Sequence, residues 1–325
     1  MKRKLFFTIG ILLGIIILSF ILSLCFGSEF FTPLQIFDIL RNISQNYESI
    51  ILFDLRIPRI LLAGLAGACL AVSGTVFQGI LKNPLADPYI TGTSSGAALG
   101  ATIAIILSFS MLPTLLFAFL GSGVVMFCVY MLSLKQRRIS VETFLLSGVI
   151  AGAFCSSFVS LLMTISGKDM PKIVWWLMGS LSGREDWNYV LFLLVCFAVG
   201  FFIVLFYSPQ INLLSMGEDI AKSKGIDTER LKLVLISSGC LLTAGAVSIC
   251  GTIGFVGFMV PHIMRGLFGG DHRVLTISSA LGGAIFLMLA DTVARSLFAP
   301  SELPCGVITA LCGVPLFFLV LKKLR

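Results

Sequence analysis

The feature of this 325-residue sequence that most restricts its fold is a series of long apolar blocks separated by short charged stretches. A membrane-crossing helix needs roughly 20 mostly apolar residues. Backbone groups in lipid must hydrogen-bond within their own segment, so blocks of this length become helices. Strands of a membrane barrel would alternate in polarity over about 10 residues, and these blocks do not alternate. The pattern predicts an all-α polytopic membrane protein.

We predict about ten transmembrane helices. Only 12% of the residues are charged, against about 25% in a soluble domain, and the mean hydropathy is +1.03. The first block follows Met-Lys-Arg-Lys, but it is long for a signal peptide and lacks a small-x-small cleavage site, so we interpret it as an uncleaved span. The predicted spans are 5–26, 58–81, 89–108, 114–134, 141–164, 189–207, 233–250, 255–270, 275–297 and 305–321.

The positive charges are divided unequally between the two sides of the membrane. Ten spans place both termini on one side, which collects all but seven of the 23 Lys and Arg residues. By the positive-inside rule, both termini are expected in the cytoplasm. The net charge of +7 is therefore attributed to membrane orientation rather than to binding of nucleic acid. The seven cations on the outer side are Arg41, Arg56, Arg59, Lys168, Lys172, Arg184 and Arg295.

The connecting segments contain further predicted structure. We expect short outer helices within 34–40 and 173–181, and an irregular Gly-rich segment at 250–262. The longest inner loop, 208–232, is expected to begin where Pro209 ends a span, and to form two short helices joined by a turn. Its apolar residues 213–216 are expected to be exposed, which favours a partner protein with a groove. Contact with the membrane surface is the alternative.

Signals for catalysis or for a bound cofactor are missing from the sequence. The P-loop pattern GxxxxGK[ST] does not occur, and no Ser/His/Asp cluster or pair of carboxylates indicates an enzyme. The nine cysteines show no CxxC spacing and are interpreted as small apolar side chains in helix packing. His262 and His272 lack neighbouring ligands. We therefore expect no catalytic site, no metal site and no cofactor bound by this chain.

A few charged residues lie in or beside the predicted spans. Asp291 and Arg295 are four residues apart on one helix face, and we favour a structural pair over a proton relay. Arg56 and Arg59 flank Pro58 at the outer start of the second span. Two interpretations remain open for them, anchoring to lipid headgroups or docking of an acidic partner outside.

Several motifs occur along the chain in an order that is specific as a set. They are Leu-Arg-Ile-Pro-Arg at 55–59, Ser-Gly-Thr-Val-Phe-Gln at 73–78, Asn-Pro-Leu-Ala-Asp-Pro at 83–88, Gly-Phe-Val-Gly-Phe-Met-Val-Pro-His at 254–262 and Glu-Leu-Pro-Cys-Gly-Val-Ile-Thr-Ala at 302–310. With these motifs the chain resembles the FecCD-type permeases of binding-protein-dependent ABC importers for ferric siderophores, haem and vitamin B12. The resemblance covers nearly the whole chain.

The resemblance implies one transmembrane permease domain over 1–325, with the type II importer fold of the vitamin B12 permease. It implies a dimer with a second copy or a paralogue, two ATPase subunits that use ATP on the cytoplasmic face, and an extracytoplasmic substrate-binding protein. The location implied is the bacterial cytoplasmic membrane. The fifth span and the short outer helix after it resemble elements that line and gate the pathway.

The resemblance also assigns roles to individual residues. Arg56, Arg59 and Arg295 match arginines that dock the binding protein through its glutamates. The residues of the inner loop that match the ATPase-coupling segment are Leu213, Leu214, Met216, Ala221 and Gly225.

The expected function is transport of a ferric siderophore, or of haem or cobalamin, powered by separate ATPases. A gradient-driven secondary transporter is the alternative, and it predicts uptake without ATP together with carboxylates inside the spans. A membrane scaffold or a channel is a further rival, which predicts no ATPase activity stimulated by a substrate. No residue in the sequence indicates a ligand for haem or for iron.

Overall fold

The computed structural model describes residues 2–41, 46–135 and 138–324, and these residues are nearly all helical. The only strands among them are β1 (Leu134–Lys135) and β2 (Arg138–Ile139), which pair in an antiparallel hairpin. The helices are α1 (Lys2–Cys25), α2 (Pro33–Arg41), α3 (Tyr47–Ile50), α4 (Ile57–Ile80), α5 (Thr93–Ile106), α6 (Met111–Ser133), α7 (Val141–Ser166), α8 (Met170–Leu177), α9 (Trp187–Met216), α10 (Glu218–Ser223), α11 (Thr228–Cys250), α12 (Val256–Phe268), α13 (His272–Ser296) and α14 (Cys305–Leu324). A π-helical turn, η1 (Ile51–Arg56), joins α3 to α4, and the 3-10 turns are η2 (Pro88–Thr91) and η3 (Gly167–Asp169).

Each of the ten predicted spans coincides with a helix, which confirms the all-α membrane fold. Six helical stretches are long and apolar enough to cross a bilayer, and four apolar helices in the described residues are shorter. The long stretches are Tyr47–Ile80, Met111–Ser133, Val141–Leu177, Trp187–Met216, Thr228–Cys250 and His272–Ser296. The shorter ones are Ile9–Cys25, Thr93–Ile106, Val256–Phe268 and Cys305–Pro315.

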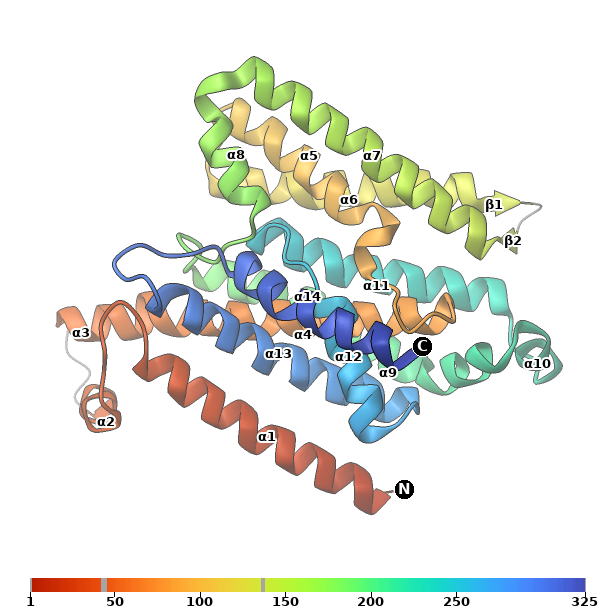
Figure 1. Ribbon diagram of the computed structural model, residues 1–325, viewed down its shortest axis with the longest axis horizontal. Helices are drawn as coiled ribbons and strands as arrows, with labels where there is room; N and C mark the ends of the chain where they lie inside the picture. Colours follow the sequence, from red (N-terminus) through yellow and green to blue (C-terminus); the bar gives the residue numbers. More distant parts are fainter. Residues whose placement is uncertain (1, 42–45, 136–137, 325) are drawn as a thin grey trace.

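Helix α4 forms the centre of the bundle, in contact with α9, α11, α12 and α13 (Figure 1). Nearly all of its residues are buried, and many are Gly, Ala or Ser, which let neighbouring backbones approach closely. The crossing of α4 and α13 is glycine on glycine: a methyl group on Gly67 would collide with the carbonyl oxygen of Gly283. Small residues at these crossings therefore set the distances between helices.

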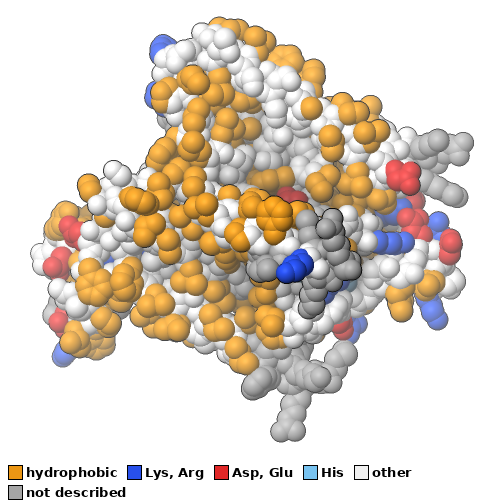
Figure 2. All heavy atoms as spheres, viewed as in Figure 1, with side chains coloured by type: hydrophobic (Ala, Val, Ile, Leu, Met, Phe, Trp, Pro, Cys, Tyr) orange, Lys and Arg blue, Asp and Glu red, His pale blue; other side chains and the backbone are white. Residues whose placement is uncertain are grey.

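Helices α5, α6 and α7 pack on one another as a second group beside this body (Figure 1). Gly96 and Gly100 on α5 lie against the backbone of α6, so this pair of glycines serves helix packing within the chain. The outward faces of α6, α7 and α9 carry many exposed large apolar side chains. Figure 2 shows hydrophobic side chains across the middle of the molecule and charged ones gathered towards its ends. This is the surface expected of a protein that spans a bilayer.

The described ends of the chain, the β1–β2 hairpin and α10 lie towards one end of the bundle, whereas α2 and α3 lie at the other (Figure 1). We call the end with the β1–β2 hairpin and α10 the inner end, and the end with α2 and α3 the outer end. Two of the cations assigned to the inner side, Arg137 and Arg325, lie outside the described residues. The short outer helices expected within 34–40 and 173–181 are present as α2 and α8.

The segment expected to be irregular at 250–262 is irregular only over 251–255, because α12 begins at Val256. Two predicted helix boundaries at prolines were also wrong. The second span was expected to start at Pro58, but a helix runs into it from Tyr47 through the π-helical turn η1. Pro209 was expected to end the sixth span, but α9 continues to Met216. Proline cannot donate a hydrogen bond to the carbonyl four residues earlier. The hydroxyl of Ser208 donates to that carbonyl, Leu205 O, at 2.8 Å, which satisfies the orphaned acceptor.

Candidate functional site

The three arginines singled out by the sequence lie together at the outer end, between the start of α4 and the end of α13. Arg56 donates to the backbone oxygens of Leu24 at 2.6 Å and Glu29 at 2.8 Å. Its guanidinium also lies 4.7 Å from the centroid of the Phe31 ring, a cation–π contact. Arg56 therefore ties the end of α1 and the following loop to the start of α4.

Arg59 is the centre of a group of carboxylates. Its guanidinium donates to Asp291 at 3.0–3.2 Å, to Glu302 at 3.0 Å and to Glu185 at 3.3 Å. The predicted pairing of Asp291 with Arg295 is present at 3.8 Å, but Arg59 holds this carboxylate more closely. Arg295 also donates to the backbone oxygen of Ser23. A carboxylate held between two arginines is poorly suited to relay protons.

These three arginines, which the resemblance assigns to docking, are buried. Arg56, Arg59 and Arg295 are only 4%, 5% and 4% exposed. The chain itself provides their partners, from loops that no spacing near the arginines indicates. In this arrangement their charges are engaged within the chain, so a docking role remains a prediction.

Glu185 and Glu302 are the residues of this site that the sequence analysis missed. They lie in the loops after α8 and α13, and both accept hydrogen bonds from Nη1 of Arg59. Burial raises the pKa of Glu185, although the nearby charge of Arg59 opposes this effect. Burial also lowers the pKa of the adjacent Arg184. The sequence offered only the bare presence of acidic residues in these loops, Glu185 beside Asp186 after α8 and Glu302 after α13.

The predicted coupling segment lies at the inner end, where α9 ends and α10 begins. Met216 is 70% exposed, but Leu214 and Ala221 are 1% and 0% exposed and pack inside the chain. Leu213 is partly buried, and Gly225, with φ +79°, ends the turn after α10. The expected exposure was therefore wrong for Leu214, because its stretch belongs to helix α9, which has a buried face, rather than to a loop. Ala221 is buried on the neighbouring helix α10. Ile220 is exposed as well, so Met216 and Ile220 both offer exposed apolar side chains at this corner of the inner end.

Charged side chains hold α10 in place. Lys232 on α11 lies 2.6 Å from Glu218 and 3.2 Å from Glu229, and donates to the backbone oxygen of Ile139 at 3.3 Å. Burial would raise the pKa of Glu218, but the hydrogen bond and charge of Lys232 bring this pKa below its usual value. A second link joins α9 to α13, because Asn212 donates to Asp271 at 2.9 Å.

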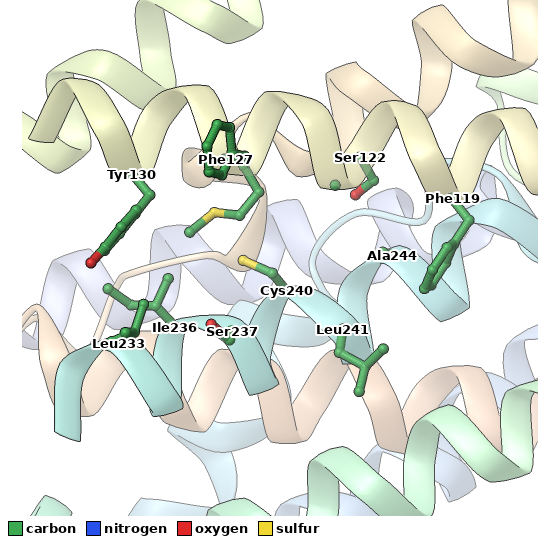
Figure 3. A pocket seen from close by; sticks show the side chains of 12 residues that line it. Phe119, Ser122, Phe127, Tyr130, Leu233, Ile236, Ser237, Cys240, Leu241 and Ala244 are labelled. Carbon is green, nitrogen blue, oxygen red and sulfur yellow. The ribbon is translucent and has the colours of Figure 1, made fainter. Parts of the chain in front are cut away.

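A groove of about 410 Å³ separates α6 from α11 in the middle of the bundle (Figure 3). Phe119, Phe127 and Tyr130 line it from α6, and Ile236 and Leu241 line it from α11. The lining is mostly apolar, with the polar side chains of Ser122, Tyr130 and Ser237 among it. Within residues 2–41, 46–135 and 138–324, no group of three or more His, Cys, Asp or Glu side chains is placed to hold a metal ion.

Comparison with known protein families identifies the family of this chain. Residues 15–323 match the model of the FecCD transport family. The chain belongs to this family. A FecCD protein is an ABC permease, a transport subunit whose ATPase is a separate protein. The inner and outer ends described above are therefore the two ends of a permease. The resemblance inferred from the sequence motifs is thereby confirmed.

Individual relatives support the same assignment. The chain is 43% identical to the cobalamin import system permease protein of Halobacterium salinarum, over 84% of this chain and 73% of the relative. It is 36% identical to the Fe(3+)-citrate import system permease protein of Bacillus subtilis, over 99% of this chain and 96% of the relative. A solved structure described as an inward-facing ABC transporter assigned to the metal-chelate type matches with a TM-score of 0.88 at 36% identity, covering 99% of this chain and 100% of that chain.

Membership of the FecCD family makes the chain a multi-pass membrane permease that works with an ATPase and a binding protein. These partners need one surface on each side of the membrane. The arginine–carboxylate group lies at one end of the bundle, and the α9–α10 corner lies at the other (Figure 1). The FecCD permease thus presents two separate candidate sites, at opposite ends of the bundle.

Proposed function

We propose that this FecCD permease carries a ferric siderophore across the bacterial cytoplasmic membrane, as one of two permease subunits above two ATPases. Both termini lie in the cytoplasm. The observation that carries the proposal is the full-length likeness to a metal-chelate type ABC transporter, with a TM-score of 0.88. The ferric-citrate relative, which matches 99% of this chain, supports an iron chelate as the cargo. The chain itself binds no cofactor and has no enzymatic activity.

The transport cycle begins when the loaded binding protein docks at the outer end. ATP binding then closes the ATPases beneath the inner end, and the exposed side chains of Met216 and Ile220 receive their movement. The partners shift the permease between conformations only as far as their affinities for those conformations differ. Leu213 and Gly225 border this surface, while Leu214 and Ala221 support it from inside.

Arg56, Arg59 and Arg295 contribute to docking mainly by holding the outer loops in position. Arg59 is already paired with Glu302 at 3.0 Å and Glu185 at 3.3 Å, so a carboxylate of the binding protein must displace one of them to reach it. Glu302 is the more exposed of the two and is the one to be displaced. Electrostatic contacts of this kind orient a partner more than they add affinity.

Reconstitution of the whole importer tests the function. The permease, its ATPase and its binding protein would be placed in liposomes, and uptake of a labelled ferric siderophore would be followed with ATP inside. We expect uptake to require ATP and the binding protein and to persist when ionophores collapse the proton and sodium gradients. Uptake driven by a gradient without ATP would instead establish the secondary transporter.

The cargo is tested on the binding protein, which selects it. This protein would be titrated with a ferric siderophore, haem and cobalamin, and uptake of the tightest ligand would be measured in the liposomes. Preference for haem or cobalamin, with matching uptake, would overturn the siderophore while leaving the importer in place.

A further inference from the structure

A lysine is buried where three elements meet at the inner end. The side chain of Lys232, in the second turn of α11, is only 2% exposed. Its ammonium is met by Glu218 of α10 at 2.6 Å, by Glu229 of α11 at 3.2 Å and by the backbone oxygen of Ile139 in β2 at 3.3 Å. A buried ammonium is costly unless it is paired and hydrogen-bonded, so these three acceptors depend on one another through Lys232.

The contacts continue from Lys232 to the base of α7. The second carboxylate oxygen of Glu229 accepts a hydrogen bond from the backbone N–H of Ile139 at 2.6 Å. Both backbone groups of Ile139 are therefore bound to side chains of α11. The next residue, Ser140, is the N-cap of α7, and its hydroxyl accepts a hydrogen bond from the N–H of Thr143. A continuous series of polar contacts thus runs from α10 through Lys232 to the first turn of α7.

Helix α10 is short and is flanked by glycines. It is six residues long, which is too short for a stable isolated helix, and glycines at φ +149° and +79° flank it, Gly217 and Gly225. If α10 moved alone, Lys232 would lose Glu218 while remaining buried. Because that loss is costly, movement of α10 is expected to draw α11 and the β1–β2 hairpin with it.

We propose that Lys232 is a positioning residue that transmits movement of α10 to the base of α7. The inference rests on the proposed function, in which an ATPase moves α10. Helix α7 continues at its outer end into η3 and α8, so a shift at its base reaches the outer half of the permease. Lys232 therefore converts ATPase movement into movement of a membrane-spanning helix without touching either the ATPase or the cargo.

Replacement of Lys232 by methionine in the reconstituted importer tests this link. We expect the cargo taken up per ATP hydrolysed to fall about tenfold, a typical size for the loss of coupling between two sites. ATP hydrolysis stimulated by the loaded binding protein should continue. The matched control is Lys222→Met: Lys222 pairs with the same Glu218 at 3.8 Å, but it is 44% exposed on α10 itself. The control should keep the normal ratio of uptake to hydrolysis.

A second variant guards against a folding defect, because Lys232→Met removes the nearest cation from both Glu218 and Glu229. Glu218→Gln weakens the link between α10 and Lys232 but keeps Glu229 beside the ammonium, and it should lower the ratio as well. A normal ratio in both variants, or a proportional loss of hydrolysis and uptake, would overturn the proposal. Wild-type uptake that needs no ATP would instead refute the proposed function itself, and the coupling role with it.

Discussion

At the scale of single residues, the outer end of the bundle is organised by buried arginines. Arg59 meets three carboxylates that lie 126, 232 and 243 positions away in the sequence. Removing one partner from a buried ion pair is strongly destabilising, because the remaining charge is left buried and unpaired. The first structural role of Arg59 is therefore to hold together the start of α4, the end of α13 and two outer loops.

Replacing Arg59 by methionine should reduce the free energy of unfolding by about 3–5 kcal/mol, the usual cost of breaking a buried pair. Thermal unfolding in detergent, followed with a thiol-reactive dye that detects buried cysteines such as Cys69, would measure the change. Lys172→Met is the control, because Lys172 is 72% exposed and its 3.5 Å contact with Asp169 should contribute less than about 1 kcal/mol. Equal melting of the two variants would show that the arginine–carboxylate group is not a stabilising unit.

Asp87, in the loop between α4 and α5, makes stability depend on pH. Burial raises the pKa of its carboxyl to about 6, although the N–H of Tyr89 donates to it. The folded-state pKa exceeds the unfolded value of about 4. The stability that the protonated carboxyl of Asp87 contributes is therefore fully present below pH ~4, and it is lost as the pH rises through about 6. Asp87→Asn stays neutral and keeps the acceptor for Tyr89 N–H.

Asp87→Asn should therefore melt about 3–6 °C above the wild type at pH 7.5 and together with it near pH 4. Melting curves across this range would measure the difference. Asp87→Ala is the companion variant, because it removes both the charge and the acceptor and so separates the two effects. A constant difference between Asp87→Asn and the wild type at all pH values would contradict the assignment.

The residue scale also shows what the sequence could predict about the sites. Spacing correctly indicated that Asp291 and Arg295 share a helix face, and the motifs placed the arginines at one end. Spacing could not indicate Glu185 or Glu302, because loop residues reach Arg59 only through the tertiary fold. Nor could it indicate the burial of Leu214, which depends on α9 continuing past Pro209 as a helix, or that of Ala221 on α10.

At the scale of whole elements, hydropathy predicted the helices well and proline predicted their ends badly. Apolar length decides whether a segment crosses the bilayer, so the existence of the helices could be predicted from the sequence. A proline costs one hydrogen bond, which a neighbouring hydroxyl such as that of Ser208 or a π-helical turn before Pro58 can offset. These local compensations have no signature in hydropathy, and both boundary errors arise from them.

The distance between α4 and α13 is set by Gly67 and Gly283, which suggests a direct test of helix packing. Gly67→Ala places a methyl group against the carbonyl oxygen of Gly283, so the helices must separate. We expect a loss of about 1–3 kcal/mol in thermal unfolding, as for other overpacked cores. The control is Gly123→Ala on α6, where a methyl group would meet nothing within 4 Å.

Gly123→Ala should leave the free energy of unfolding unchanged or increase it by up to about 1 kcal/mol, since alanine is the better helix former. A Gly67→Ala variant as stable as Gly123→Ala would mean that α4 and α13 can separate without cost. The small residues of α4 would then have another purpose than close packing.

At the scale of the whole molecule, the helices divide into a buried core and a set that faces outwards. Helix α4 is shielded on all sides, whereas α6, α7 and α9 carry apolar side chains on exposed faces. The sequence predicted ten spans and an unequal distribution of cations, because both follow from the bilayer. Which helices are central could not be predicted, because α4 and α9 are both predominantly apolar and long enough to cross the bilayer.

Orientation in the membrane is the last property that follows from the whole molecule. Lys172, before α9, and Lys224, after α10, are exposed and separated by a single predicted crossing, α9. The excess of cations on the side of Lys224 predicts that this side faces the cytoplasm. Lys172→Cys and Lys224→Cys, each in a Cys128→Ser and Cys312→Ser background, would be treated with a membrane-impermeant maleimide. This background removes the exposed native cysteines of the described chain.

We expect Lys172→Cys to react in cells whose cytoplasmic membrane is intact and Lys224→Cys to react only after that membrane is permeabilised. The parent background serves as the control for labelling of the buried cysteines. The reverse result would invert the permease and move the ATPase surface of α10 to the outside, which no ATP-driven partner could use. Reaction of both variants in intact cells would mean that α9 does not cross the bilayer, and the ten-span topology would fail with it.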